Sequence, residues 1–238
     1  MDHDLRSSFE VFSQSKIHLT DQLQVGREVC SVSQIIATLE PLLLPERMEK
    51  LKRVIERRSL QVVTVLENIY DRGNVSAVMR TAESLGFFRF HLIEPEKAKF
   101  KAANRVTRGA EKWLDVNVSH RLTDSIEKLK SAGYVVAGTD LDATHDLTDV
   151  PMERPIALVI GNEKTGISEE MKQAVDLRIK IPMVGFSQSY NLSVASALCL
   201  FELYKKQDPS KGMSEEQRKQ LYANYLLRCF DHPERFFR

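Results

Sequence analysis

The chain has few of the residues that mark several common classes of protein. Cysteine occurs three times in 238 residues, at Cys30, Cys199 and Cys229. No two cysteines have the spacing of a metal site, and their odd number and wide separation suggest no disulfide framework. No apolar run approaches the roughly 20 residues that a membrane-spanning helix needs, and no basic stretch followed by an apolar run marks a signal peptide. We therefore expect a cytoplasmic protein with no metal centre and no membrane partner.

A large charge of one sign is also missing, because the net charge is only +1. The charge is nevertheless uneven along the chain. Residues 46–58 carry six basic and three acidic side chains, and residues 97–112 carry six basic and one acidic. Local basic segments of this kind suit a phosphate-rich partner. Solvated helix faces would explain either segment taken alone.

Strand-like and helix-like segments alternate between residues 60 and 205. Short apolar or β-branched runs predict the strands, and segments with helical periodicity follow most of them. The alternation predicts an α/β fold with a mostly parallel sheet and helices on both faces. Strands are expected at 60–67, 88–93, 116–119, 134–140, 155–161 and 177–182, and helices at 45–58, 76–85, 122–132, 193–205 and 215–229. A short helix is also indicated at 31–40, and a further helix start at Ser168. We divide the chain into an N-terminal extension (1–44), the α/β domain with its basic helix (45–208) and a helical tail (209–238).

Three segments rich in glycine, serine or amide side chains stand out from this pattern. They span residues 74–83, 160–168 and 181–195, and each follows a strand-like run. Polar side chains at the carboxyl ends of parallel strands are the usual way in which an α/β protein forms a ligand site. Three such segments in one domain indicate one composite site, and they favour an enzyme.

The second and third segments leave alternatives open when each is read alone. Gly161 and Gly166 are five positions apart, but no Lys-Ser/Thr pair follows the second glycine, which argues against a nucleotide-triphosphate loop. Glu163 is either an exposed turn carboxylate or a functional group. Ser189 and Asn191 are good helix N-caps, although capping alone does not explain so many small and amide residues in succession.

In the first segment, Arg80 lies within an otherwise apolar helical run. A buried arginine is costly unless it is paired or bound to an anion, and its guanidinium offers a fixed cation with a fork of donors for phosphate. We therefore favour a functional role for Arg80, and Asn74 is a candidate cap for the same helix.

Taken together, the three segments resemble the motifs of the SPOUT superfamily, in its SpoU branch of ribose 2′-O-methyltransferases. The closest likeness is to the TrmH family of tRNA guanosine 2′-O-methyltransferases, and it covers about residues 45–205. The order and spacing of the motifs match, and the basic helix that begins at Pro45 resembles that family's N-terminal helix. Tyr70–Gly73 stands where the family often has a turn with histidine and proline. The matching motifs are Asn74-x5-Arg80 followed by Thr81-Ala82-Glu83, Leu158–Gly166, and Ile181–Ala197.

The resemblance implies S-adenosylmethionine as methyl donor and the D-loop guanosine at position 18 of tRNA as target. It also implies a C-terminal trefoil knot and a homodimer with the site at the subunit interface. Arg80 would activate the ribose 2′-hydroxyl, Asn74 would hold Arg80, and Glu163, Ser189 and Asn191 would shape the catalytic pocket. The cofactor would bind near Thr139, Gly161, Ile181, Met183 and Leu192. We expect RNA contacts from Arg53, Arg57, Arg58, Arg105 and Arg108.

Elementary chemistry limits what Arg80 can do. A guanidinium has too high a pKa to act as an ordinary base, so its expected help is a fixed positive charge that stabilises a developing alkoxide. Two alternatives stay open: the same reaction on ribosomal RNA, and a catalytically silent RNA-binding dimer. The presence of all five candidate catalytic residues argues against lost catalysis.

Overall fold

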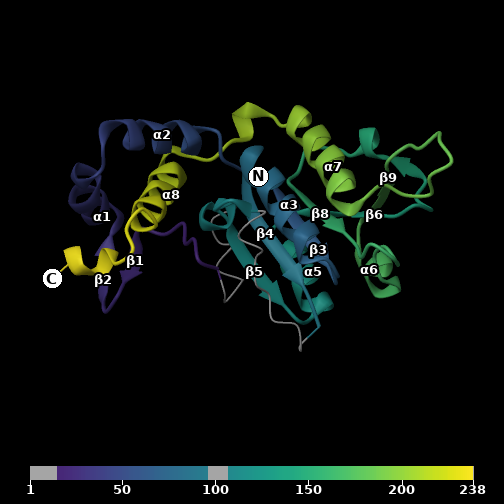
Figure 1. Ribbon diagram of the computed structural model, residues 1–238, viewed down its shortest axis with the longest axis horizontal. Coiled ribbons are helices and arrows are strands. Elements are labelled where there is room, and N and C mark those ends of the chain that lie inside the picture. The colour runs from purple at the N-terminus through teal and green to yellow at the C-terminus, as the bar shows by residue number, and fades with distance from the viewer. Residues whose placement is uncertain (1–14, 96–106, 238) are drawn as a thin grey trace. The chain divides into compact units, whose positions relative to one another are not determined.

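The computed structural model describes residues 15–95 and 107–237, and its contacts divide them into two units (Figure 1). One unit consists of Ser59–Lys211 together with Ser15. The other consists of Lys16–Arg58 and Gly212–Arg238. The sequence suggested three consecutive parts, whereas in the structure the segments before and after the sheet pack with each other. The basic helix belongs to this second unit.

The first unit is organised around a parallel sheet. Among its described residues, seven strands pair in the order β5-β4-β3-β8-β6-β9-β7, and every pair is parallel. The central strands β3 and β8 are buried along their whole length, as the β-branched run of β3 and the continuous apolar run of β8 predict. The mostly parallel sheet is therefore confirmed. The strands are β3 (Ser59–Glu67), β4 (Phe87–Ile93), β5 (Asp115–Ser119), β6 (Val135–Thr139), β7 (His145–Asp146), β8 (Ile156–Ile160) and β9 (Leu177–Lys180).

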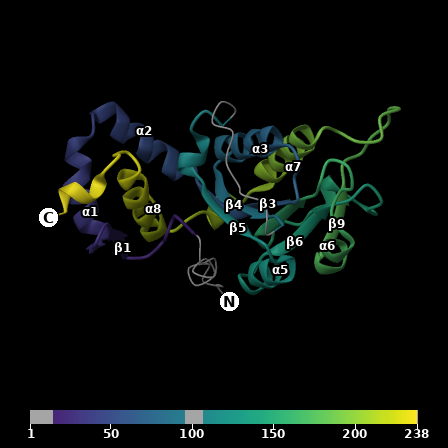
Figure 2. The same ribbon diagram turned by 60° about the horizontal axis from the view of Figure 1, so that its bottom comes forward.

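Helices cover both faces of this sheet, as predicted. Helices α3 (Arg72–Ser84) and α7 (Leu192–Lys206) pack together on one face, and α5 (Leu122–Ser131) and α6 (Glu169–Ala174) lie on the other (Figure 2). Short 3-10 turns complete the connections: η2 (Ala110–Trp113), η3 (Leu147–Asp149) and η4 (Pro209–Lys211).

Helix α3 begins four residues before the predicted start at residue 76. The reason is Asp71, whose side chain caps the helix by accepting a hydrogen bond from the backbone N–H of Gly73 at 2.7 Å. Asn74 therefore lies inside the first turn, where its side chain is not needed as the cap.

The second unit joins the two flanking segments of the chain. A hairpin of β1 (Gln22–Val25) and β2 (Glu28–Ser31) leads into α1 (Val32–Leu39), η1 (Glu40–Leu42) and α2 (Pro45–Glu56). Both α1 and α2 pack against α8 (Glu215–Leu227), which is followed by η5 (Pro233–Phe236). The Tyr222 hydroxyl of α8 donates to Glu40 at 2.9 Å. The sequence indicated α1, α2 and α8, but not the hairpin.

Two further expectations concern the core and the membrane. Cys199 lies in an apolar helical run, which predicts a core position, and it is fully buried in α7. Burial raises the pKa of its thiol to about 12. In the described part of the chain, no helix is long and apolar enough to cross a membrane.

Candidate active site

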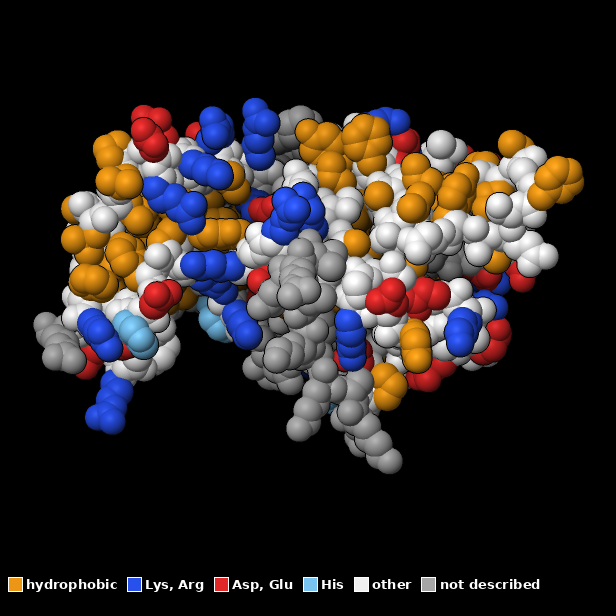
Figure 3. Space-filling model, in the orientation of Figure 1, with side chains coloured by type: hydrophobic (Ala, Val, Ile, Leu, Met, Phe, Trp, Pro, Cys, Tyr) orange, Lys and Arg blue, Asp and Glu red, His pale blue; other side chains and the backbone are white. Residues whose placement is uncertain are grey.

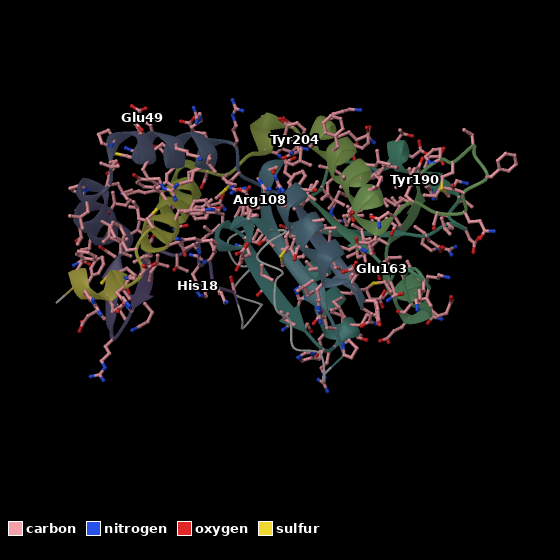
Figure 4. All side chains as sticks on the ribbon, viewed as in Figure 1. His18, Glu49, Arg108, Glu163, Tyr190 and Tyr204 are labelled. Carbon is pink, nitrogen blue, oxygen red and sulfur yellow. The ribbon has the colours of Figure 1, made fainter. Side chains whose placement is uncertain are left out.

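A cavity of about 550 Å³ opens at the carboxyl ends of β6, β8 and β9. Its walls come from the loops that follow these three strands and from the start of α7. This is the edge at which open parallel sheets bind ligands. Figure 4 labels Glu163, on the loop that follows β8, and Tyr190, on the loop that leads into α7. The lining segments are 139–142, 160–167, 179–181 and 188–192, together with Lys172, Met183 and Ala195.

The five residues expected at the cofactor all line this cavity. They are Thr139, Gly161, Ile181, Met183 and Leu192. The structure thus brings together residues from four separate stretches of the chain. The volume falls in the range of small-molecule and cofactor sites.

Gly161 shows most clearly why the β8 loop needs glycine. A Cβ atom at this position would lie 2.1 Å from the backbone of both Gly166 and Ile167, so no other residue fits. The loop is closed by two backbone hydrogen bonds of 2.9 Å between Asn162 and Gly166, and Gly166 has a φ of +68°. The wall of the cavity is therefore a tight backbone turn.

Glu163 joins this loop to the beginning of α3. Its carboxylate accepts hydrogen bonds from the Asn74 side-chain amide at 3.0 Å and from the backbone N–H groups of Tyr70 at 3.1 Å and Asp71 at 3.2 Å. Burial alone would raise the pKa of the Glu163 carboxyl, but these hydrogen bonds outweigh it and leave the pKa below its ordinary value. Glu163 is half-buried and not a free turn carboxylate.

Arg80 is placed differently from the expectation. Its side chain is exposed on α3, and its guanidinium has no hydrogen bond or ion pair with any other residue that the structure describes. The premise of a buried arginine is therefore wrong. Arg80 does not line the cavity of its own chain, and the Asn74 side chain bonds to Glu163 and not to Arg80.

Ser189 and Asn191 line the cavity from the loop before α7. Asn191 caps α7 by accepting from the backbone N–H of Ser193 at 2.9 Å and from its hydroxyl at 2.6 Å. Ser189 is exposed. Capping thus accounts for Asn191, while Ser189 faces the cavity with its hydroxyl available.

The expected RNA contacts fall into three groups. Arg53, Arg57 and Arg108 are exposed. Arg58 is a correction: its side chain is only 3% exposed, and its guanidinium lies 5.7 Å from the centre of the Tyr225 ring. The chain turns inward after α2, so this arginine packs under α8 within the second unit. Arg105 lies outside the described residues.

Several residues that position the site were missed by sequence reasoning. Asp71 caps α3, and the sequence signal was available, since aspartate directly before a helix is a favoured N-cap. Glu67, at the end of β3, and Asn162, in the loop after β8, make contacts between segments that are distant in sequence. No local pattern predicts such contacts.

The sheet and its cavity define an α/β protein with a ligand site at the carboxyl edge of its strands. Comparisons with known proteins make this class specific. Residues 61–201 match the model of the SpoU rRNA Methylase family. The chain is 34% identical to a tRNA (guanosine(18)-2′-O)-methyltransferase of Borreliella burgdorferi, over 80% of this chain and 88% of the relative. The chain belongs to the SpoU rRNA Methylase family.

Other relatives and solved structures agree. A tRNA (guanosine(18)-2′-O)-methyltransferase of Thermus thermophilus is 34% identical over 76% of this chain and 93% of its own length. The crystal structure of the A. aeolicus TrmH/SpoU tRNA modifying enzyme superposes with a TM-score of 0.69 at 28% identity, covering 76% of this chain and 95% of that one. The SpoU methyltransferase AviRb from Streptomyces viridochromogenes, solved with AdoMet, gives a TM-score of 0.56 at 25% identity over 63% of this chain and 58% of that one.

Proposed function

We propose that this protein transfers a methyl group from S-adenosylmethionine to the ribose 2′-hydroxyl of the D-loop guanosine at position 18 of tRNA. The observation that carries the proposal is the convergence of the motif loops around one cavity in a chain whose relatives bear this activity in their names. The trefoil knot is part of the same proposal and rests on family membership.

The residues around the cavity fit the proposed methyl donor. Ile181, Met183 and Leu192 offer apolar contact for a flat heteroaromatic ring, and the glycine turn at Gly161 lets backbone polar groups approach its edge. The carboxylate of Asp140, also in the wall, binds the Arg178 guanidinium at 3.1 Å and accepts from the backbone N–H of Asp142 at 3.2 Å, so it holds the loop after β6 in place. When bound, S-adenosylmethionine supplies an activated methyl group with a neutral thioether as leaving group. The chain's own task is then mainly alignment.

Arg80 is proposed to act on the RNA. A ribose hydroxyl is a weak nucleophile, and negative charge develops on its oxygen as the new bond forms. A guanidinium close to this oxygen stabilises that charge and also grips the neighbouring phosphate. Its exposure and its lack of a partner among the described residues leave the cation available for RNA.

Glu163 and Asn74 are proposed to hold α3, and with it Arg80, in position against the β8 loop. The lowered pKa of Glu163 keeps its carboxylate ionised at neutral pH, so it accepts hydrogen bonds and does not supply a proton. Ser189 is proposed to contact substrate at the rim of the cavity, where it is exposed.

A homodimer is proposed through the exposed face of α7. Four large apolar side chains recur along this helix at spacings of three and four residues, and they are 41–53% exposed: Val194, Leu198, Phe201 and Tyr204. Val184 and Phe186 in the preceding loop are completely exposed. Figure 3 shows hydrophobic side chains gathered over α7. A contiguous apolar surface of this kind marks an interface. Because α3 packs beside α7, the dimer would bring Arg80 of one copy toward the cavity of the other.

The exposed basic side chains of α2 are proposed to bind the tRNA backbone. Lys50 and Arg53 are exposed on this helix, whereas Arg47 is half-buried and the Lys52 ammonium pairs with Glu40 at 2.6 Å. Lys and Arg side chains line the helix in Figure 3. Phosphate contacts give affinity without sequence information. Action on tRNA and three free thiols support a cytoplasmic location.

The test is transfer of labelled methyl from S-adenosylmethionine to unmodified tRNA and, in parallel, to unmodified ribosomal RNA, with the product mapped. The proposal expects 2′-O-methylguanosine in the tRNA D-loop. Methylation of ribosomal RNA alone would replace the target but keep the reaction. Transfer to neither RNA, together with retained RNA binding, would favour a catalytically silent RNA-binding dimer.

A further inference from the structure

The end of strand β3 holds both ends of the loop that forms one wall of the cavity. This loop, residues 162–168, follows β8, which pairs with β3 in a register that places Leu66 beside Ile160. The backbone oxygen of Asn68 accepts a hydrogen bond from the Asn162 side-chain amide at 2.6 Å. At the other end of the loop, the Glu67 carboxylate binds Ser168.

Both carboxylate oxygens of Glu67 accept hydrogen bonds from Ser168. Oε1 accepts from the Ser168 hydroxyl at 2.5 Å, and Oε2 accepts from the Ser168 backbone N–H at 3.0 Å. Glu67 is only 2% exposed, and it forms no ion pair with a lysine or arginine in the part of the chain that the structure describes. Burying a carboxylate is costly unless its oxygens are hydrogen-bonded. Ser168 meets that requirement, so the carboxylate and the serine fix each other.

The position of Ser168 is passed on to the wall of the cavity. The Ser168 hydroxyl also accepts from the backbone N–H of Met171 at 3.1 Å. Ser168 is therefore the N-cap of α6 and joins the loop to this helix. Ile167, the preceding residue, is 2% exposed and lines the cavity. Gly161 packs so closely on Gly166 and Ile167 that it leaves no space for even a methyl group. A shift of Ser168 therefore displaces the wall itself.

We propose that Glu67 is a positioning residue for the methyl-donor cavity and acts through Ser168. It touches neither the donor nor the RNA, and it sets the distance between the β3 end and the glycine turn. The identity of the ligand rests on the proposed function. The attachment of the loop to Glu67 and Asn68 rests on the hydrogen bonds of these two residues with Ser168 and Asn162.

The test measures binding of S-adenosylmethionine by calorimetry in the absence of RNA. Glu67→Gln leaves one acceptor oxygen for two donors, and Ser168→Ala removes the hydroxyl. Each is expected to weaken binding about tenfold, as loss of a supporting hydrogen bond does at other sites. Ser168→Thr keeps the hydroxyl and is expected to bind within about twofold of the wild type. The double variant E67Q/S168A should resemble either single variant, because both lose the same contact.

Glu170→Gln is the matched control, since Glu170 is an exposed carboxylate on α6 that bonds to Thr123. It should leave affinity unchanged. The KM for RNA should stay within about twofold in every variant, and hydrogen exchange at residues 166–168 should accelerate in E67Q and S168A only. If E67Q does not fold, the S-adenosylmethionine affinities of S168A and S168T test the proposal, because both variants retain Glu67 and only S168A lacks the hydroxyl.

Three results would count against the proposal. If folded E67Q and S168A bind S-adenosylmethionine as tightly as the wild type, the positioning role of Glu67 is wrong, and the proposed function is unaffected. Equal loss of donor and RNA binding, with a large fall in Tm, shows a general structural role and overturns it too. A wild-type protein that binds no S-adenosylmethionine contradicts the proposed function itself, and the role of Glu67 falls with it.

Discussion

The two sides of the candidate site differ in how far one chain completes them. On the cofactor side, the walls are held by backbone turns and by hydrogen bonds between loops, as at Gly161 and Glu163. On the RNA side, Arg80 is exposed without a described partner, and Ser189 is exposed at the rim. The difference indicates that the donor site is preorganised within the chain, whereas the proposed RNA site around Arg80 would be completed by RNA and by the second copy of the proposed dimer.

The largest effect is expected from Arg80→Ala. Removing the fixed cation should lower kcat for RNA methylation at least about a hundredfold, the loss seen when one stabilising donor is removed from an oxyanion site. Affinity for S-adenosylmethionine should not change, because Arg80 does not line the cavity. Single-turnover rates and calorimetry on the same preparation check both halves of this prediction. If R80A lost activity and donor affinity to the same degree, Arg80 would contribute to the donor site, which contradicts the proposed separation of the two sides.

The complementary change is Ala195→Trp, which fills the cavity from α7. Ala195 is half-buried in the cavity wall, so a large ring there should weaken donor binding about tenfold to a hundredfold and leave tRNA affinity intact. Ala195→Ser is the control for the backbone position. Calorimetry with the donor and filter binding with tRNA separate the two affinities. Loss of tRNA binding in A195W would show that the two ligands share the cavity.

Mixing the R80A and A195W proteins sharpens the comparison further. If Arg80 serves the cavity of the partner copy, a mixed dimer contains one intact site, and activity should return from two inactive proteins. If Arg80 serves its own chain, the mixture should stay inactive. The measurement is methyl transfer after the two proteins are refolded together.

A smaller effect is expected from Glu163→Gln. The folded-state pKa of Glu163 lies below its ordinary value, so the carboxylate stabilises the fold above the ordinary range near pH 4.3, and this contribution is lost as pH falls through the folded-state pKa. In E163Q the acid-dependent loss should shrink, and activity at neutral pH should fall about tenfold because α3 is held less firmly. Tm measured from pH 7 to pH 3 tests the first part. An unchanged pH profile would contradict it.

The smallest effects concern neighbouring arginines of the second unit. Arg57 is exposed and Arg58 is buried over Tyr225. Arg57→Ala should weaken tRNA binding severalfold and lower the slope of log affinity against log salt by about one. Arg58→Ala should instead cost about 1–3 kcal/mol of stability, with the salt slope kept. Salt titrations of tRNA binding and thermal melts of both variants test these two roles. A lower salt slope in R58A and a lower stability in R57A would show that the two roles are reversed.

Much of the fold could be predicted because its signals are local. The β-branched run of β3 predicts a buried strand and the Ser168 cap predicts the start of α6, and both are present. The hairpin of β1 and β2 was missed because four-residue strands show too little alternation to register. Helix α3 was started too late because Asp71 was assigned to the turn and not to the cap.

The site was predictable only as far as motifs reach. The five residues expected at the cofactor lie together on the cavity because the motif loops follow strands whose ends meet at one edge. Burial was not predictable for single arginines, so Arg58 was assigned to the surface and Arg80 to the interior, and both assignments are reversed. Contacts between loops, such as that of Glu67 with Ser168, depend on tertiary structure and carry no sequence signal.

The most direct test of the account uses two tRNA transcripts that differ by one oxygen atom. One carries the ordinary guanosine at position 18, the target named for the relatives, and the other carries 2′-deoxyguanosine there. With labelled S-adenosylmethionine, the account predicts one methyl group per ordinary transcript and none in the deoxy transcript. Equal incorporation into both transcripts would contradict methylation of the 2′-hydroxyl at this position.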